Sequence, residues 1–145
     1  MFLKKLDEKR TYKNVQQFFL EDFDQLQRLS QAESLVATND PSRAMSGSHK
    51  DSDSLNISHY SYKQLYEVCL KAIEQLPENY KALLKCKFLY GQKAVALEKR
   101  LNVCESTFYK WQRKAFISFA NSLFIVSSQE NPKHPINFRI YEGDQ

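Results

Sequence analysis

Residues 94–119 carry two short helical patterns on either side of one turn residue, and this arrangement constrains the fold more than any other part of the chain. Leu97 and Leu101 are four residues apart, so they share one face of a helix. Asn102 follows, and asparagine tolerates the left-handed conformation in which many helices end. Val103 is placed to fill the inside of the turn. We therefore expect two helices joined by a tight turn, which is a helix-turn-helix.

The second of these helices, which starts near Cys104, has one apolar face and one basic face. Its apolar residues recur at spacings of three and four: Phe108, Trp111, Ala115 and Phe119. Its other face carries Glu105, Ser106, Tyr109, Lys110, Arg113 and Lys114. A buried apolar stripe beneath a basic outer face suits the major groove of DNA, and we expect Phe108 and Trp111 to belong to the core. An ordinary amphipathic hairpin with a solvated face would show the same spacing.

Positive charge is concentrated around this motif. Residues 76–120 contain nine Lys or Arg and three Asp or Glu, a net charge of +6, whereas the whole chain has 21 against 17, a net charge of +4. The rest of the chain therefore sums to −2. Such a concentration is typical of a phosphate-binding surface, and it predicts double-stranded DNA as the partner. Lys93, Lys99 and Lys114 are placed for contacts to the DNA backbone.

In this geometry the first turns of the second helix face the edges of the bases. Glu105 can accept a hydrogen bond from a cytosine amino group, and Ser106 can donate to a base or a phosphate. Tyr109 can reach a thymine methyl group or a phosphate. Lys110 and Arg113 are the candidates for guanine O6 and N7 or for adjacent phosphates, and Arg is the better bidentate reader.

The composition favours a small all-α domain with an arm. The chain has 145 residues, 42% of them hydrophobic, and only 3 Gly and 4 Pro, which is few for a fold built on hairpins. No apolar run approaches the roughly 20 residues that cross a bilayer. The N-terminus also lacks the apolar core of a signal peptide. We therefore expect a cytoplasmic protein with no membrane partner.

Residues that could carry catalysis or bind a metal are scattered. The three cysteines are far apart in the sequence: Cys69, Cys86 and Cys104. The histidines lie in polar surroundings: His49, His59 and His134. We expect neither a metal site nor a disulfide framework from these spacings. The chain also has no Gly-rich phosphate loop and no catalytic constellation, so we predict no cofactor and no enzymatic activity.

The pattern of elements divides the chain into four segments: an N-terminal helical arm (1–30), a flexible linker (31–57), a helix-turn-helix domain (58–125) and an extended tail (126–145). The linker is rich in Ser, Asp, Asn, Gly and Pro, and its few apolar residues have no period, so it cannot bury enough surface to offset its ordering entropy.

The arm contains a helix from about Thr11 to Ser30, with Thr11 as its N-cap. Its apolar residues recur at spacings of three and four: Tyr12, Val15, Phe19, Phe23, Leu26 and Leu29. This helix has two possible roles. It packs on the C-terminal domain, or it associates with a second copy of the chain to form a homodimer through its aromatic face.

The domain is expected to contain two helices before the helix-turn-helix. The first starts at Ser58 or Ser61 and ends near Gln75, and the second follows Pro77 and ends before Gly91, at about Leu89. The last helix of the domain is expected to continue through Leu123 to Ile125.

The tail cannot continue that helix, because it contains Pro132 and Pro135. Ile136, Phe138 and Ile140 alternate with polar residues or tyrosine, as in a strand. A lone strand is unstable in water, so this one docks on the domain, pairs with a partner's tail or stays mobile.

From Leu76 to Phe116 the chain resembles the fourth region of bacterial sigma factors. That region opens with Leu-Pro, continues through a helix that ends in an aromatic residue and a glycine, and closes on a helix-turn-helix; here these parts read LPENYKALLKCKFLYG and AVALEKRLNVCESTFYKWQRKAF. The chain is also similar to the ArpU family of phage and prophage transcriptional regulators. TYKNVQQFFLEDFDQLQRL resembles the early segment of that family, and ESTFYK with the later Lys114, Ala115 and Phe116 resembles its recognition helix.

The resemblance implies a sequence-specific DNA-binding regulator, an activator, of phage or prophage late genes such as those for packaging and lysis. Two residues depart from the pattern. Cys104 stands where these families usually have Ser, which weakens the helix cap unless Ser106 or a phosphate compensates. Glu98 stands where a small residue is preferred, and we expect it to lean towards Arg100, Lys99 or solvent.

Two other functions fit the same resemblance. One is a sigma-like protein that interacts with RNA polymerase and has little affinity for DNA. The other is the small DNA-recognition subunit of a phage packaging motor, which also joins a helix-turn-helix to an oligomerising arm. Salt discriminates between the first of these and DNA binding, because binding through several phosphates weakens steeply as the salt concentration rises.

Overall fold

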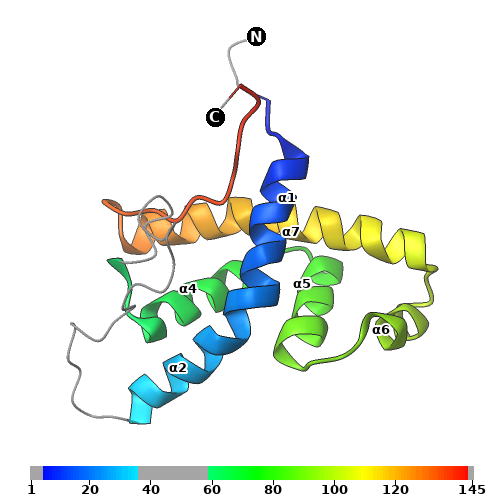
Figure 1. Ribbon diagram of the computed structural model, residues 1–145, viewed down its shortest axis with the longest axis horizontal. Coiled ribbons are helices and arrows are strands. Elements are labelled where there is room, and N and C mark those ends of the chain that lie inside the picture. Colours follow the sequence, from blue (N-terminus) through cyan, green and yellow to red (C-terminus); the bar gives the residue numbers. More distant parts are fainter. Residues whose placement is uncertain (1–4, 36–58, 144–145) are drawn as a thin grey trace.

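The computed structural model describes residues 5–35 and 59–143, and within these ranges the chain forms five helical segments and no named strand (Figure 1). The elements are α1 (Glu8–Gln17), η1 (Phe18–Asp22), α2 (Phe23–Leu35), α4 (Tyr62–Glu74), α5 (Glu78–Leu84), η4 (Lys85–Leu89), α6 (Ala94–Leu101) and α7 (Glu105–Glu130). The two η elements are π-helical turns that continue α1 into α2 and extend α5. The predicted all-α fold is therefore confirmed. None of the helices in these ranges combines the length and apolarity required to cross a bilayer.

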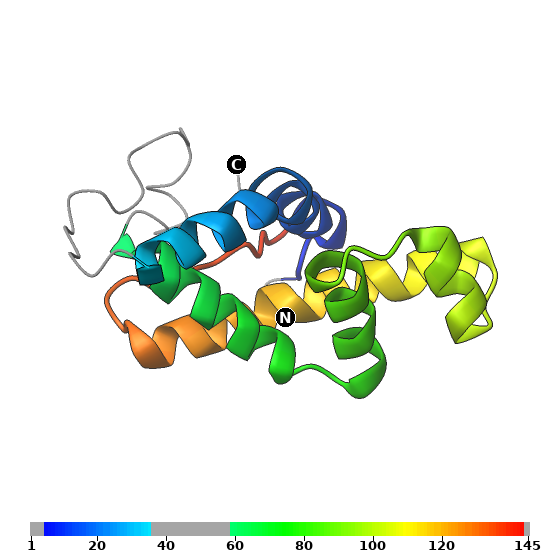
Figure 2. The ribbon, with the colours of Figure 1, turned by 90° about the horizontal axis from the view of Figure 1, so that it is seen from below.

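Helix α7 is the longest element, with 26 residues, and α1, α4, α5 and α6 pack along it, whereas α2 packs on α4. Helix α1 crosses it, α4 and α5 lie against its C-terminal and middle parts, and α6 lies beside its N-terminal end (Figure 1). Seen from below, α6 and the start of α7 extend away from α1, α2 and α4 (Figure 2). The largest fully buried side chains come from the N-terminal helix, α4, α5, α6, α7 and the tail, so these elements share one core.

The π-helical turn η1 allows two consecutive phenylalanines to face this core. In a regular α-helix neighbouring residues point about 100° apart, and an additional residue in the turn shifts the apolar stripe to the next position. Phe18 is 4% exposed and lies 5.3 Å from Phe138, between ring centroids. Phe19 is 3% exposed and stacks on Phe88 at 4.5 Å. The aromatic face of the arm thus packs within the chain, and a homodimer through that face would compete with these contacts.

The N-terminal helix is longer at both ends than the sequence predicted. It begins at Glu8, because the side chain of Asp7 accepts a hydrogen bond from the backbone N–H of Arg10 at 3.1 Å and caps the helix. The predicted cap, Thr11, is buried inside the helix. Helix α2 continues to Leu35, so residues 31–35 of the predicted linker are helical, and residues 36–57 lie outside the described part of the chain.

The helices before the helix-turn-helix begin and end close to the predicted residues. Ser61 caps α4 through a capping box, in which its hydroxyl accepts from the N–H of Gln64 at 3.1 Å and the Gln64 side chain accepts from the N–H of Ser61 at 3.0 Å. The alternative cap, Ser58, lies outside the described residues. Pro77 directly precedes α5. Gly91 follows η4 with φ of +69°, a left-handed conformation that glycine adopts without strain.

Helix α7 ends five residues later than predicted. It runs to Glu130 and not to Ile125, so the extended tail begins at Asn131 and not at residue 126. Before Pro132 the segment has no residue that would break the helix, and Val126 and Ser127 are buried by continuing it.

The tail docks on its own chain, which is one of the three outcomes that the sequence left open. Ile136 and Phe138 are buried, and the N–H of Ile136 donates to the hydroxyl of Ser127 at 2.8 Å. Further along, Leu6 and Tyr141 form an isolated antiparallel β-bridge. Beside it, the N–H of Asp7 donates to the carbonyl of Ile140 at 2.7 Å. These contacts hold the two described ends of the chain together.

Candidate nucleic-acid interface

The turn between α6 and α7 has the predicted geometry. Asn102 adopts φ of +57° and ψ of +48°, the left-handed conformation, directly after Leu101. The N–H of Asn102 donates to the carbonyl of Lys99 at 3.2 Å, and the N–H of Val103 donates to the carbonyl of Glu98 at 3.0 Å. This pair of bonds is a Schellman motif, which satisfies two carbonyls at the helix end and turns the chain sharply. Val103 packs against the core, as predicted.

The apolar face of α7 is buried as the spacing predicted. Phe108, Ala115 and Phe119 have no exposed surface, and Trp111 lies at the edge of the stripe, partly buried against the core. Leu97 of α6 is buried beneath the same stripe. Because these side chains anchor α6 and α7 to the rest of the fold, the opposite face of α7 is held in a fixed orientation.

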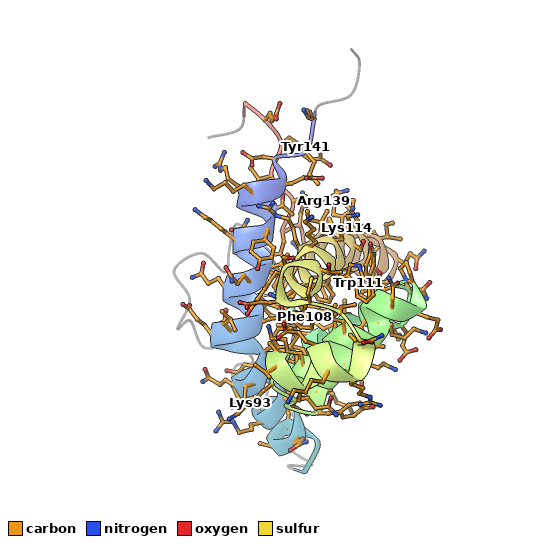
Figure 3. The ribbon with its side chains drawn as sticks, turned by 90° about the vertical axis from the view of Figure 1, so that its right-hand side faces the viewer. Lys93, Phe108, Trp111, Lys114, Arg139 and Tyr141 are labelled. Carbon is orange, nitrogen blue, oxygen red and sulfur yellow. The ribbon has the colours of Figure 1, made fainter. Side chains whose placement is uncertain are left out.

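That opposite face displays most of the predicted DNA-contacting residues together. All six of the predicted residues on α7 are exposed: Glu105, Ser106, Tyr109, Lys110, Arg113 and Lys114. Lys99 is exposed on α6, and Lys93 precedes its first turn. The end view in Figure 3 places Lys93 and Lys114 at opposite edges of the α6–α7 pair. The structure thus groups the six predicted residues of α7 on one exposed face of that helix. It places Lys93 and Lys114 apart from each other.

Cys104 occupies the N-cap of α7, and its thiol makes no capping hydrogen bond of ordinary geometry. Its Sγ lies 3.3 Å from the hydroxyl oxygen of Ser106 and 3.2 Å from that of Thr107. Hydrogen bonds from the Ser106 hydroxyl first, and then from the Thr107 hydroxyl, lower the pKa of the Cys104 thiol from its ordinary value to about 7. The exposed thiol is therefore a weak cap that becomes a thiolate near neutral pH.

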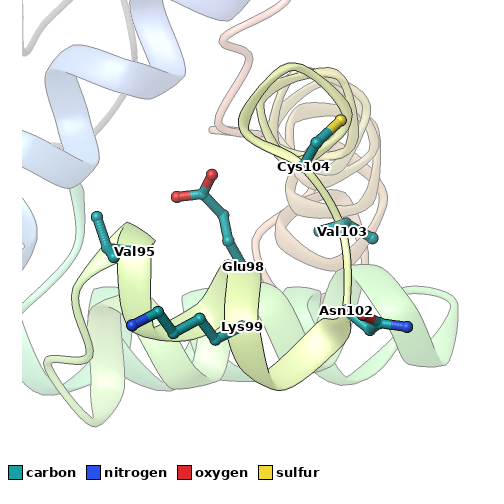
Figure 4. Close-up of a pocket in the computed structure, with 6 residues that line it drawn as sticks. All are labelled: Val95, Glu98, Lys99, Asn102, Val103 and Cys104. Atoms are coloured by element: carbon teal, nitrogen blue, oxygen red, sulfur yellow. The ribbon is translucent and has the colours of Figure 1, made fainter.

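An open pocket of about 450 Å³ lies between α6 and the start of α7. It is lined by Val95, Glu98, Lys99, Asn102, Val103 and Cys104. The carboxylate of Glu98 points into this pocket and is partly exposed (Figure 4). It does not pair with Arg100, whose guanidinium instead donates to the side-chain oxygen of Gln92 at 3.4 Å. Of the three orientations expected for Glu98, which were towards Arg100, Lys99 or solvent, the structure shows the one towards solvent.

A polar chain beneath the exposed face links three helices, and the sequence analysis did not identify it. Lys87 donates to the side-chain oxygen of Gln112, which is buried on the apolar side of α7. The amide of Gln112 donates in turn to the hydroxyl of Tyr12 at 3.3 Å. Burial lowers the pKa of Lys87. The sequence feature that could have indicated this polar chain is Gln112 itself, because it is a polar residue one turn after Phe108 on the apolar stripe.

Tyr12 also connects α1 directly to the basic face of α7. Its ring stacks on Phe116 with centroids 5.3 Å apart, and the guanidinium of Arg113 lies over the same ring at 5.7 Å from its centroid. The electron-rich face of the aromatic ring attracts the guanidinium cation, and this attraction limits the directions in which the Arg113 side chain extends. Helix α1 thereby helps to position a residue of the candidate interface.

Among residues 5–35 and 59–143, no group of three or more His, Cys, Asp or Glu side chains is arranged to hold a metal ion. His59 and His134 are close, but their rings stack on each other, with centroids 3.5 Å apart. Comparison with protein families, with curated proteins and with solved structures finds no match to this chain.

Proposed function

We propose that this protein is a sequence-specific regulator of transcription that binds double-stranded DNA through the α6–α7 helix-turn-helix. One observation carries the proposal. A left-handed residue, Asn102, sets the angle between two helices, and the second helix buries an apolar stripe while it exposes a hydrogen-bonding and basic face. A major groove about 12 Å wide accepts one such helix, and that helix must project beyond neighbouring elements to enter it. Helix α6 and the start of α7 extend from the body in this way (Figure 2).

The exposed residues divide into readers of bases and contacts to the backbone. Arg113 and Lys110 are the candidates for guanine, Tyr109 for a thymine methyl group, and Glu105 and Ser106 for cytosine or phosphate. The lysines supply charge to the phosphates: Lys93, Lys99 and Lys114. Since Lys93 and Lys114 lie at opposite edges of the α6–α7 pair, they suit phosphates on different strands of one groove.

The resemblance to the fourth region of sigma factors and to the ArpU family supports phage or prophage late genes as the targets, with activation as the mode of regulation. The described helices follow the same order as the resembling segment. Leu76 and Pro77 precede α5, Gly91 follows η4, and α6 and α7 close the domain. The N-terminal helix, whose sequence resembles the early segment of the ArpU family, shares the core of this domain.

A second candidate is a sigma-like protein that interacts with RNA polymerase. It is favoured by exposed apolar side chains near the start of α6, where Tyr90 is 67% and Val95 is 64% exposed. Such residues suit a protein partner more than a phosphate backbone. Docking on them would depend weakly on salt, which separates this function from DNA binding.

The test is selection of duplexes from a random pool with the full chain, followed by affinity measurements at about 50 and 200 mM salt. We expect one enriched sequence, with affinity that falls as the salt concentration rises. Arg113→Ala should weaken binding to the enriched duplex by about 1–3 kcal/mol and binding to a scrambled duplex by less. Lys63→Ala is the matched control, because Lys63 is exposed on α4, at the other end of the molecule. Failure to enrich any sequence would contradict the proposal.

A further inference from the structure

Helix α1 presents a basic edge next to the recognition surface of α7. Lys9, Tyr12, Lys13 and Gln16 are spaced by three, one and three residues, so they lie along one side of α1. The middle of this edge is fixed by contacts. The Tyr12 hydroxyl accepts from Gln112, and the Tyr12 ring lies beneath the Arg113 guanidinium. Lys9 and Lys13 therefore flank a tyrosine that touches the predicted base-reading face.

The other side of α1 is occupied by the tail. Thr11 exchanges hydrogen bonds with the backbone of Ile140, and the side chain of Asn14 donates to the carbonyl of Phe138 at 3.1 Å. Figure 1 shows the tail on one side of α1, with α6 and the start of α7 on the other. The edge that carries Lys9 and Lys13 consequently lies away from the tail, and Tyr12 of this edge contacts α7.

The charges on this edge are not neutralised within the described residues. Lys9 and Lys13 are exposed, and neither forms an ion pair there. Lysines on α4 and on α5 with η4 do pair with glutamates: Lys71 with Glu130, Lys81 with Glu78 and Glu74, and Lys85 with Glu74. Among the residues that the structure describes, no basic side chain of the α7 face forms an ion pair either. The unpaired lysines of α1 and the unpaired basic residues of α7 therefore lie on either side of the Tyr12–Arg113 contact. A polyanion such as DNA would stabilise this concentration of positive charge.

The position of α1 determines which part of a duplex it would meet. Helix α1 packs on α7 at Phe116, one turn beyond Arg113, whereas the base-reading residues lie in the first turns of α7. Lys9 and Lys13 are about 6 Å apart along the helix, since each residue rises by about 1.5 Å. We infer that Lys9 and Lys13 bind backbone phosphates of the DNA that flanks the sequence read by α7. This inference rests on the proposed function and extends its interface to the N-terminal helix.

The test compares the wild-type chain with the double variant Lys9→Ala/Lys13→Ala on the enriched duplex, at several salt concentrations. Two lost phosphate contacts should lower the slope of log K against log salt concentration by about 2. The sequence preference should not change, because phosphate contacts carry no base information. The loss of affinity should disappear on a duplex trimmed to the bases that α7 reads.

The matched control is Lys63→Ala/Lys133→Ala, which removes two exposed lysines from α4 and from the turn after α7. It should leave the salt slope at the wild-type value. If the Lys9→Ala/Lys13→Ala variant also retains the wild-type slope while the wild type binds the enriched duplex, this inference is wrong and the proposed function stands. If the wild type binds no duplex, both are wrong. Unchanged thermal unfolding of the variants will show that the substitutions leave the fold intact.

Discussion

The guanidinium of Arg113 lies 5.7 Å from the centroid of the Tyr12 ring, and this contact joins the exposed face of α7 to α1. The same ring stacks on Phe116, and its hydroxyl accepts from Gln112. One tyrosine thus contacts a buried ring, a buried amide and an exposed cation on a single helix. The N-terminal helix and the candidate interface are therefore physically coupled, although 100 residues separate Tyr12 from Gln112 in the chain.

The first prediction is a measurable coupling between Tyr12 and Arg113. In a double-mutant cycle with Tyr12→Leu and Arg113→Ala, we expect a coupling free energy of about 0.5–1 kcal/mol, the range for a cation–π pair near the surface. Urea unfolding of the four proteins would measure it. Strict additivity of the two substitutions would show that the cation and the ring do not interact.

The second prediction concerns the aromatic face of the N-terminal helix. Phe19→Ala should lower the free energy of unfolding by about 3–5 kcal/mol, because the ring is buried against Phe88, Phe116 and Phe119. Leu20→Ala is the control. Leu20 is the next residue but is 64% exposed, so its loss should change stability by no more than about 0.5 kcal/mol. A small effect of Phe19→Ala, accompanied by dissociation of a dimer, would instead place this face between chains.

The third prediction tests the turn of the helix-turn-helix. Asn102→Ala should destabilise the protein by about 1 kcal/mol, because alanine pays a steric penalty at φ of +57°. Asn102→Gly should be close to neutral, since glycine adopts this conformation freely. Thermal or urea unfolding would compare them. Equal effects of the two substitutions would mean that the left-handed conformation does not determine the stability of the turn.

The fourth prediction concerns pH. The folded Cys104 thiol has a pKa of about 7 against an ordinary value of 9.0, so its alkylation rate should rise through pH 7 and then level off. Because the folded pKa is the lower one, the associated stabilisation is complete above the unfolded pKa and is lost as the pH falls towards 7. A rate that continues to rise up to pH 9.0 would contradict the assignment.

Two variants serve as controls for the alkylation experiment. Ser106→Ala removes the hydroxyl that contributes most to the shift, so the midpoint of the rate profile should move to higher pH. Cys104→Ser should abolish the fast reaction, because Cys104 is the exposed thiol, whereas Cys86 is half-buried and the burial of Cys69 raises its pKa. The same substitution supplies a better N-cap and should raise the midpoint of thermal unfolding by a few degrees.

Features specified by neighbouring residues could be predicted from the sequence. Asn102 marked the end of α6, the three- and four-residue spacings marked the buried stripe of α7, and Gly91 marked the end of the helix before α6. Each depends on local backbone conformation or on helical periodicity. The exposed face of α7 followed from the stripe, because residues that lie opposite a buried stripe must face outward.

Features that depend on distant contacts could not be predicted in this way. The turn η1 exists because Phe18 and Phe19 both find partners in α7 and the tail, which no local pattern specifies. The docking of Phe138 likewise depends on its contacts with Asn14 and Phe18, which lie far away in the sequence. The separation of Lys93 from Lys114 also depends on how α6 crosses α7, although both residues belong to the same basic segment.

The most direct test of the central claim is a footprint of the full chain on the duplex enriched from the random pool, at low and moderate salt. The α7 interface predicts one discrete protected segment that persists at moderate salt, with protection lost in Arg113→Ala and retained in Lys63→Ala. Diffuse protection along the duplex that disappears at moderate salt would contradict sequence-specific binding and would leave only a basic surface.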